Sequence, residues 1–223
     1  MKLHTVFITY NRLELTKETI LSYRETVHCP YTFCVVDNAS SDDTRRWLLN
    51  TGFDVHLLSE NRYPGYASNF GWSHAPDDAT HLHRSDNDFR FLPGWSEQVE
   101  HAFQSEKVGK VGLRTDAEDE FAHNTGGNCV IRRDLFDKGL RYDERPWPQI
   151  RAEVGDGYSE DSFFSAQVRV MGYTWTRVKQ PAIQNLASGD WSDEYYRTSY
   201  GVRGIKPRAG DPTVPEGFVP YGE

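Results

Sequence analysis

The triplet Asp86-Asn87-Asp88 is the first group whose residue types and spacing suit chemistry. It follows residues 80–84, which we expect to form a buried strand. Two carboxylates at this spacing can hold a hard divalent cation such as Mn²⁺ or Mg²⁺, which takes oxygen ligands. A cation there can act as a Lewis acid on a departing pyrophosphate. Surface loops also contain such triplets, so the position at a strand end is the stronger indication.

A second acidic pair, Glu160-Asp161, lies near the start of an amphipathic segment expected to be helical over residues 159–171. Acidic residues at a helix start ordinarily act as caps or as partners of the helix dipole. A direct displacement also needs one carboxylate that takes the proton of the attacking hydroxyl. We predict that Asp161 is this base and that Glu160 binds the acceptor or orients the site.

Two further side chains could bind a nucleotide. Asp37 follows the apolar run Val35-Val36 and could accept a hydrogen bond from the ring N–H of a uracil, or cap the turn that it begins. Arg62 precedes Gly65 at a helix start, where an anion is favoured. Its guanidinium could reach a diphosphate, and the alternative is an exposed loop arginine.

The elements that must position these residues alternate between strand and helix in the first half of the chain. Such alternation predicts an α/β fold with a mostly parallel central sheet. Strands are expected at residues 3–8, 31–36, 54–58, 80–84, 108–113 and 126–132, and helices around residues 15–27, from Asp42-Asp43 onward, at 66–74, at 95–104, before Gly139 and at 159–171.

Polar clusters fall where three of these strands end. Because ligands bind beyond the carboxyl ends of parallel strands, we expect the clusters to form one rim. They are residues 9–12, 37–41 and 86–88.

Composition excludes several classes. The chain has 223 residues, 37% of them hydrophobic, and a formal charge of -8, which disfavours nonspecific nucleic-acid binding. Its three cysteines form no CxxC pair, so a disulfide framework is not expected.

We predict one domain over residues 1–200, with a nucleotide-binding half at about 1–90 and an acceptor half at about 91–200, and a Pro/Gly-rich tail at 201–223. The sequence contains no membrane-length apolar run and no signal peptide, so a cytoplasmic location is expected.

Over roughly residues 3–186 the chain resembles the family 2 inverting glycosyltransferases of the GT-A fold, a Rossmann-like three-layer sandwich. Each matching stretch is weak alone, and seven in the right order are specific. They lie at residues 6–12, 35–40, 61–71, 85–88, 93–95 and 126–133, and the last is 160–161 followed by 172–173.

The resemblance implies a role for each matching residue. Thr9, Asn11 and Asp37 would contact the nucleoside, and Arg62 the base or the diphosphate. Asp88 would be the principal metal ligand, Asp86 would touch ribose or metal, and Asp161 would be the base. The donor would be a nucleotide sugar, with UDP expected. The short chain without an anchor favours transfer of a single sugar.

The chain departs from the family at one metal ligand. Many relatives supply a His after the last core strand, whereas all eight His here precede Glu160. Asn185 or Asp190 could take that place, or water and pyrophosphate could complete the coordination.

Other functions and several acceptors stay open. A non-catalytic nucleotide- or glycan-binding domain would not be expected to keep both Asp88 and Asp161, and a sugar nucleotidyltransferase would want a Gly-rich phosphate loop after the first strand. A dinucleotide-binding module would need a GxGxxG there.

The acceptor could be a glycan, a modified nucleobase or a protein, and the oligomeric state is not encoded in any recognisable pattern. Candidate stacking residues are Trp147, Tyr158, Trp175 and Trp191, within an acceptor region at 121–128, 142–158 and the tail.

Overall fold

The computed structural model describes residues 1–115, 128–155, 160–187 and 216. It divides into two units, Met1–Gln184 and Asn185–Glu223, and the first contains the central sheet. The predicted boundary at residue 200 stays a prediction, because residues 188–215 lie outside the described part.

The strands are β1 (Leu3–Thr9), β2 (Tyr31–Asp37), β3 (Val55–Leu57), β4 (His81–Asp86), β5 (Phe89–Phe91), β6 (Val108–Gly112), β7 (Asn128–Arg132), β8 (Thr174–Arg177) and β9 (Ile183–Asn185). The helices are α1 (Leu13–Thr26), α2 (Thr44–Leu48), α3 (Tyr63–Ser73), α4 (Trp95–Ala102), α5 (Arg133–Asp137), α6 (Trp147–Val154) and α7 (Glu160–Val170).

The central sheet has seven strands in the order β3-β2-β1-β4-β7-β6-β8. Strand β7 is antiparallel to both of its neighbours, and the other pairings are parallel. The mostly parallel sheet predicted from the alternation of strands and helices is therefore confirmed. Strands β5 and β9 pair in a separate two-stranded sheet.

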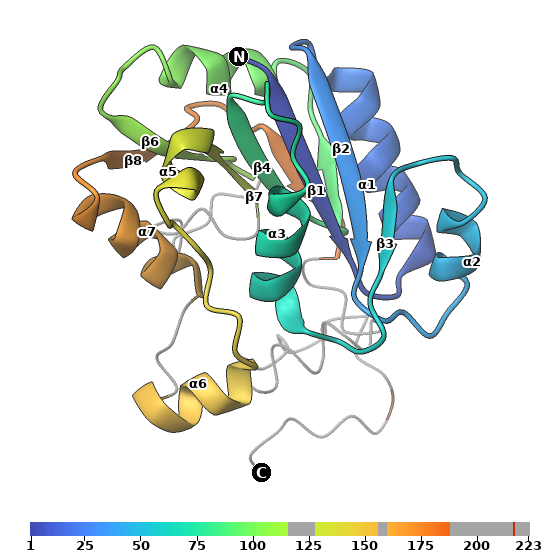
Figure 1. Cartoon of the computed structure of the whole chain (residues 1–223). Coiled ribbons are helices and arrows are strands. Elements are labelled where there is room, and N and C mark those ends of the chain that lie inside the picture. The colour runs from blue at the N-terminus through green and yellow to red at the C-terminus, as the bar shows by residue number, and fades with distance from the viewer. Residues whose placement is uncertain (116–127, 156–159, 188–215, 217–223) are drawn as a thin grey trace. The chain divides into compact units, whose positions relative to one another are not determined.

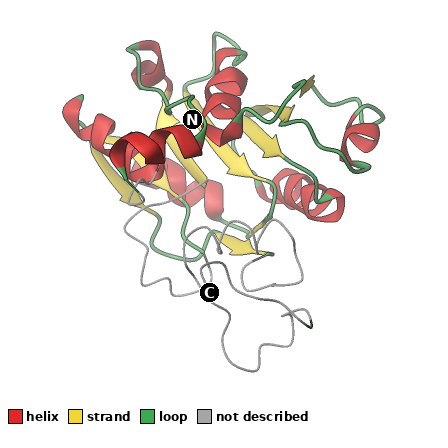
Figure 2. Ribbon diagram, turned by 90° about the horizontal axis from the view of Figure 1, so that it is seen from below, coloured by secondary structure: helices red, strands yellow, loops and turns green. Residues whose placement is uncertain are grey.

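Helices cover both faces of the sheet, which gives three layers (Figures 1 and 2). Strand β1 is buried at all seven positions, so alternate side chains enter different layers. Leu3 and Phe7 join a cluster with side chains of α1 and α4. Val6 and Ile8 join the cluster that contains side chains of α3, α5 and α7. Helix α3 lies in front of the sheet in Figure 1.

Some element boundaries differ from the sequence predictions. Helix α3 begins at Tyr63 rather than at residue 66, because Pro64 suits the first helical turn. Helix α2 begins at Thr44, so Asp42 and Asp43 precede it instead of lying in its first turn. Asp42 Oδ1 still accepts a hydrogen bond from the Thr44 N–H at 2.9 Å. Elements β5, α6, β8 and β9 were not predicted.

None of the helices in the described residues combines the length and the apolar character needed to cross a bilayer.

Candidate active site

The three polar strand ends lie side by side. Residue Thr9 of β1 is in register with Asp37 of β2, and Ile8 is in register with Asp86 of β4. Parallel pairing therefore brings the segments that follow these strands to one edge of the sheet, as the sequence predicted.

Asp37 is enclosed at this rim, with 0% of its side chain exposed. Its Oδ1 accepts a hydrogen bond from Thr9 Oγ1 at 3.2 Å. Its Oδ2 accepts one from the Ser40 N–H at 3.1 Å and lies 3.3 Å from Arg45 Nε. The carboxylate thus closes the turn after β2, which is the alternative that the sequence left open. A nucleobase would have to use its remaining lone pair or replace one of these donors.

Asn11 ties the loop after β1 to the loop after β2. Its backbone N–H donates to Ser40 Oγ at 2.7 Å, and its Oδ1 accepts from the Ser41 N–H at 2.7 Å. Both Asn11 and Arg12 have positive φ, 56° and 66°, an unusual conformation for residues other than glycine. Such backbone conformations concentrate at functional sites, where surrounding contacts hold them.

The loop after β4 is held against the same segment. Asn87 Nδ2 donates to the Asn11 carbonyl and to Thr16 Oγ1, both at 2.9 Å. Asp88 Oδ2 accepts a hydrogen bond from Arg12 Nη1 at 3.0 Å. The two aspartates of the triplet therefore lie at the rim, and each is paired with an arginine, Asp88 with Arg12 and Asp86 with Arg84.

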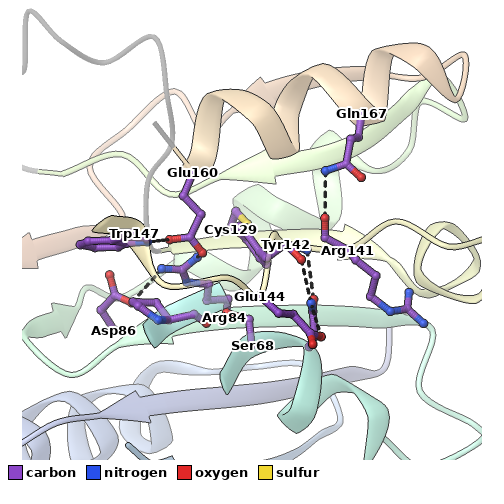
Figure 3. Close-up of polar contacts among 12 residues, drawn as sticks. Ser68, Arg84, Asp86, Cys129, Arg141, Tyr142, Glu144, Trp147, Glu160 and Gln167 are labelled. Carbon is purple, nitrogen blue, oxygen red and sulfur yellow. Dashed lines mark hydrogen bonds and ion pairs between the residues drawn. The ribbon is translucent and has the colours of Figure 1, made fainter. Parts of the chain in front are cut away.

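Arg84 joins the two predicted acidic groups, as Figure 3 shows. Its side chain is 3% exposed. Nη1 donates to Glu160 Oε1 at 3.1 Å, and Nη2 donates to Asp86 Oδ1 at 3.4 Å. Trp147 Nε1 donates to the other oxygen of Glu160 at 3.2 Å. The start of α7 is thereby connected to the end of β4.

Arg84 was missed as a site residue from the sequence. The available signal was a charged residue inside a strand expected to be buried, two positions before Asp86 and hence on the same face. Its partner Glu160 is 76 residues away, so local spacing does not reveal the pair.

The cluster contains more carboxyl groups than cations, and the pKa values of two of these carboxyl groups are raised. Burial raises the pKa of Glu160 to about 7; Asp161 and Asp86 act in the same direction, and Arg84 opposes them. Desolvation raises the pKa of Asp86 to about 6; Arg84 opposes the shift, and Asp88 and Asp161 add to it. The excess negative charge favours binding of a cation.

The raised pKa of Glu160 predicts a pH-dependent stability. The folded protein holds this proton up to about pH 7, whereas the ordinary value is 4.5. The free energy of unfolding should therefore fall as the pH rises from about 4.5 to about 7, by on the order of 3 kcal/mol from this group. Denaturant unfolding of the ligand-free protein at several pH values measures the effect.

The control for this experiment is Glu160→Gln, which cannot titrate. The variant should lose less stability than the parent over the same pH range, because only the contribution of Glu160 has been removed. Equal slopes in the two proteins would contradict the assignment. The other carboxyl groups titrate in both proteins, so the difference between the two slopes removes their contribution.

Asp161 follows Glu160 in the first turn of α7. Its Oδ1 is buried and has no hydrogen-bond partner among the described residues. Its backbone carbonyl accepts from Ser165 Oγ at 2.7 Å. A buried acceptor without a donor is costly, and such atoms concentrate where a ligand completes the hydrogen bonding.

Arg62 lies at the start of α3. Its backbone N–H donates to Asn38 Oδ1 at 2.7 Å, while its side chain is 44% exposed. The guanidinium carbon lies 4.2 Å from the centre of the Tyr66 ring. Gly65 has a structural reason to be glycine, since a Cβ there would lie 2.2 Å from the Asp143 carbonyl oxygen. The predicted reason, close approach of an anion, is not needed to explain it.

The carboxylates of Asp86 and Asp88 fit Mg²⁺ or Mn²⁺ as a partial set of ligands. The described residues contain no group of three or more His, Cys, Asp or Glu side chains that could hold a metal ion. Mg²⁺ is usually held by one or two carboxylates, with waters and substrate phosphates completing its octahedron. Two aspartates at the rim match that arrangement rather than an all-protein cage.

Several other predicted groups are placed differently or not described. Trp147 contacts Glu160 and lies 5.8 Å from the Tyr63 ring, whereas Trp175 lies on the edge strand β8. Asn185 Oδ1 accepts from the Ala187 N–H at 2.9 Å. Tyr158, Asp190, Trp191 and residues 121–127 lie outside the described residues.

A sequence model described as Glycosyl transferase family 2 matches residues 5–148, which is more than half of the chain. The chain belongs to glycosyltransferase family 2. The match includes the ends of β1, β2 and β4 and stops before α7. No curated protein matches the chain.

Solved structures show the same fold. The mannosyltransferase PcManGT from Pyrobaculum calidifontis, in complex with GDP-Man and Mn²⁺, is 18% identical with a TM-score of 0.66 over 90% of this chain and 60% of that one. S. aureus TarS 1–349 in complex with UDP is 15% identical with a TM-score of 0.63, over 91% and 64% of the two chains. The family 2 chain described here therefore has the GT-A fold and spans about 60% of the mannosyltransferase chain.

Proposed function

We propose that this family 2 chain transfers one sugar from a nucleotide sugar to an acceptor hydroxyl with inversion. The observation that carries the proposal is the Arg84 bridge between Asp86 and Glu160. It unites the two acidic groups that such a reaction requires, one beside the leaving diphosphate and the other beside the attacking hydroxyl.

The donor would bind along the ends of β1, β2 and β4. Thr9, Asn11 and Asp37 would contact the nucleoside, and the exposed Arg62 guanidinium would contact the base or the diphosphate. Asp88 and Asp86 would hold Mn²⁺ or Mg²⁺, which when bound supplies positive charge to the leaving diphosphate. The complexes of GDP-Man with Mn²⁺ and of UDP in the two neighbours support a nucleotide-sugar donor. UDP remains our expected nucleotide.

Asp161 would act at the acceptor. In a single displacement, the acceptor oxygen bonds to the anomeric carbon as the bond to the diphosphate oxygen breaks, and the base takes the hydroxyl proton. Asp161 Oδ1 is buried and has no hydrogen-bond partner among the described residues, which supports this role. Glu160, held by Arg84 and Trp147, would orient the site.

A thermal-shift screen of nucleotides and nucleotide sugars, with and without Mn²⁺, tests the proposal. A ligand at about 100 times its dissociation constant should add about 2.7 kcal/mol of stability. We expect UDP or a UDP-sugar to stabilise the protein in a Mn²⁺-dependent way. GDP in place of UDP would correct the donor, and absence of any shift would contradict a nucleotide site.

Two assays separate the competing functions. A transferase hydrolyses its donor slowly when the acceptor is missing, whereas a non-catalytic binding domain shows a nucleotide-dependent shift without hydrolysis. A sugar nucleotidyltransferase would instead form a nucleotide sugar from a nucleoside triphosphate and a sugar 1-phosphate. Production of a nucleotide sugar in that mixture would refute the transferase.

A further inference from the structure

Lys110 lies in the middle of β6 and is fully buried, with 0% exposure. Lysine is almost never fully buried unless it is paired. Its Nζ donates to Ser165 Oγ at 2.8 Å and lies 5.7 Å from the centre of the Phe164 ring. Within the described part of the chain, no carboxylate forms a salt bridge with it. A buried ammonium group held by one hydroxyl and one ring is a costly arrangement.

Ser165 connects Lys110 to Asp161, the predicted base. Its hydroxyl donates to the backbone carbonyl of Asp161 at 2.7 Å while it accepts from Lys110. The chain Lys110–Ser165–Asp161 therefore reaches the residue whose side chain is expected to take the acceptor proton.

A second buried cation contacts the first turn of α7. Arg84 binds the side chain of Glu160, and its guanidinium carbon lies 4.6 Å from the centre of the Tyr142 ring. That ring is stacked on Phe164 at 3.9 Å with an interplanar angle of 7°. Arg84 of β4 thus contacts Glu160, and Lys110 of β6 contacts Ser165 five residues later in α7, with a stacked aromatic pair between the two cations.

We propose that Lys110 is a positioning residue for Asp161, acting through Ser165. The proposal rests on the proposed transferase function. Packing alone does not account for a lysine here, because a methionine would fill a similar space without the desolvation of a charge. A shift of the base by about 1 Å can slow a reaction about 100-fold, so a fixed carbonyl at Asp161 matters for turnover.

The test compares Lys110→Met with Lys107→Met, an exposed lysine three residues earlier. In K110M we expect turnover of the nucleotide-sugar donor to fall about 10- to 100-fold, with the dissociation constant for nucleotide and Mn²⁺ within two-fold of the parent. Hydrogen exchange should quicken at the amides of residues 164–168, and the unfolding midpoint should not drop. K107M should match the parent in every measurement.

Three outcomes would overturn the proposal. Unchanged exchange in α7 would show that Lys110 does not hold the helix. Faster exchange with turnover within two-fold of the parent would make its role structural. A parent chain that neither binds nucleotide nor turns over donor would overturn both proposals, and it is recognised before any variant is compared.

A second variant covers the case in which K110M fails to fold. Ser165→Ala removes the relay hydroxyl and keeps the lysine, and it should reproduce the loss of turnover. The double variant K110M/S165A should recover no turnover relative to S165A, because both changes break the same chain of contacts. Full turnover in S165A would overturn the proposal.

Discussion

An Asp161→Asn variant is expected to bind nucleotide and Mn²⁺ like the parent chain and to transfer sugar about 10²- to 10⁴-fold more slowly. Asparagine keeps the shape of the side chain but cannot take a proton at neutral pH, and general bases contribute rate factors of this size. The side-chain Oδ1 has no partner among the described residues, so the substitution removes no hydrogen bond there. Steady-state turnover and nucleotide titration, measured on the same preparation, test the two halves of the expectation.

The matched control is Asp134→Asn, at a half-exposed aspartate on α5 that pairs with Lys138. It should retain full turnover and full nucleotide binding. Transfer by D161N within about ten-fold of the parent would refute the assignment of Asp161 as the base. Loss of nucleotide binding in D161N would place Asp161 in the donor site instead.

An Asp88→Ala variant is expected to lose the Mn²⁺-dependent part of nucleotide binding. Under conditions in which nucleotide and Mn²⁺ stabilise the parent by about 2.7 kcal/mol, the variant should show little additional stability when Mn²⁺ is added. The reason is that two carboxylates at the rim are the proposed protein ligands, and the metal would join them to the diphosphate. Chelation of the metal in the parent should abolish turnover.

The unfolding midpoint of D88A without ligand serves as an internal control, since the change also removes the carboxylate that Arg12 contacts. Asp134→Ala, remote from the rim strands in sequence, should respond to Mn²⁺ like the parent. Undiminished turnover of the parent after chelation would show that the metal hypothesis is wrong.

The sequence was most informative where burial is continuous. Strand β1 is buried at every position and β2 at its last four, so their apolar runs marked both strands and their ends. Because the rim is made by strand ends, the positions of Asp37 and Asp86 followed from the same pattern. The short elements β5 and β9, of three residues each, have too few residues to establish a period.

The connections within the site could not be predicted in this way. Arg84 and Lys110 were missed as site residues because a charged residue inside a buried strand is an unusual position, but no local pattern identifies its partner. Their partners on α7 are 76 and 55 residues away. The internal bonding of Asp37 was open for the same reason, since Arg45 approaches it from α2.

The enclosure of Asp37 has a consequence for how this chain could diverge. The carboxylate expected to contact the nucleoside also bonds Thr9, Ser40 and Arg45, all of which hold the rim together. A substitution at Asp37 would change both the donor preference and the stability of the fold. Selection for a new nucleotide would therefore be constrained at this position. Arg62, nearly half exposed, can change without that penalty. New donor preferences should therefore arise first at the periphery of the rim, while Asp37 stays fixed.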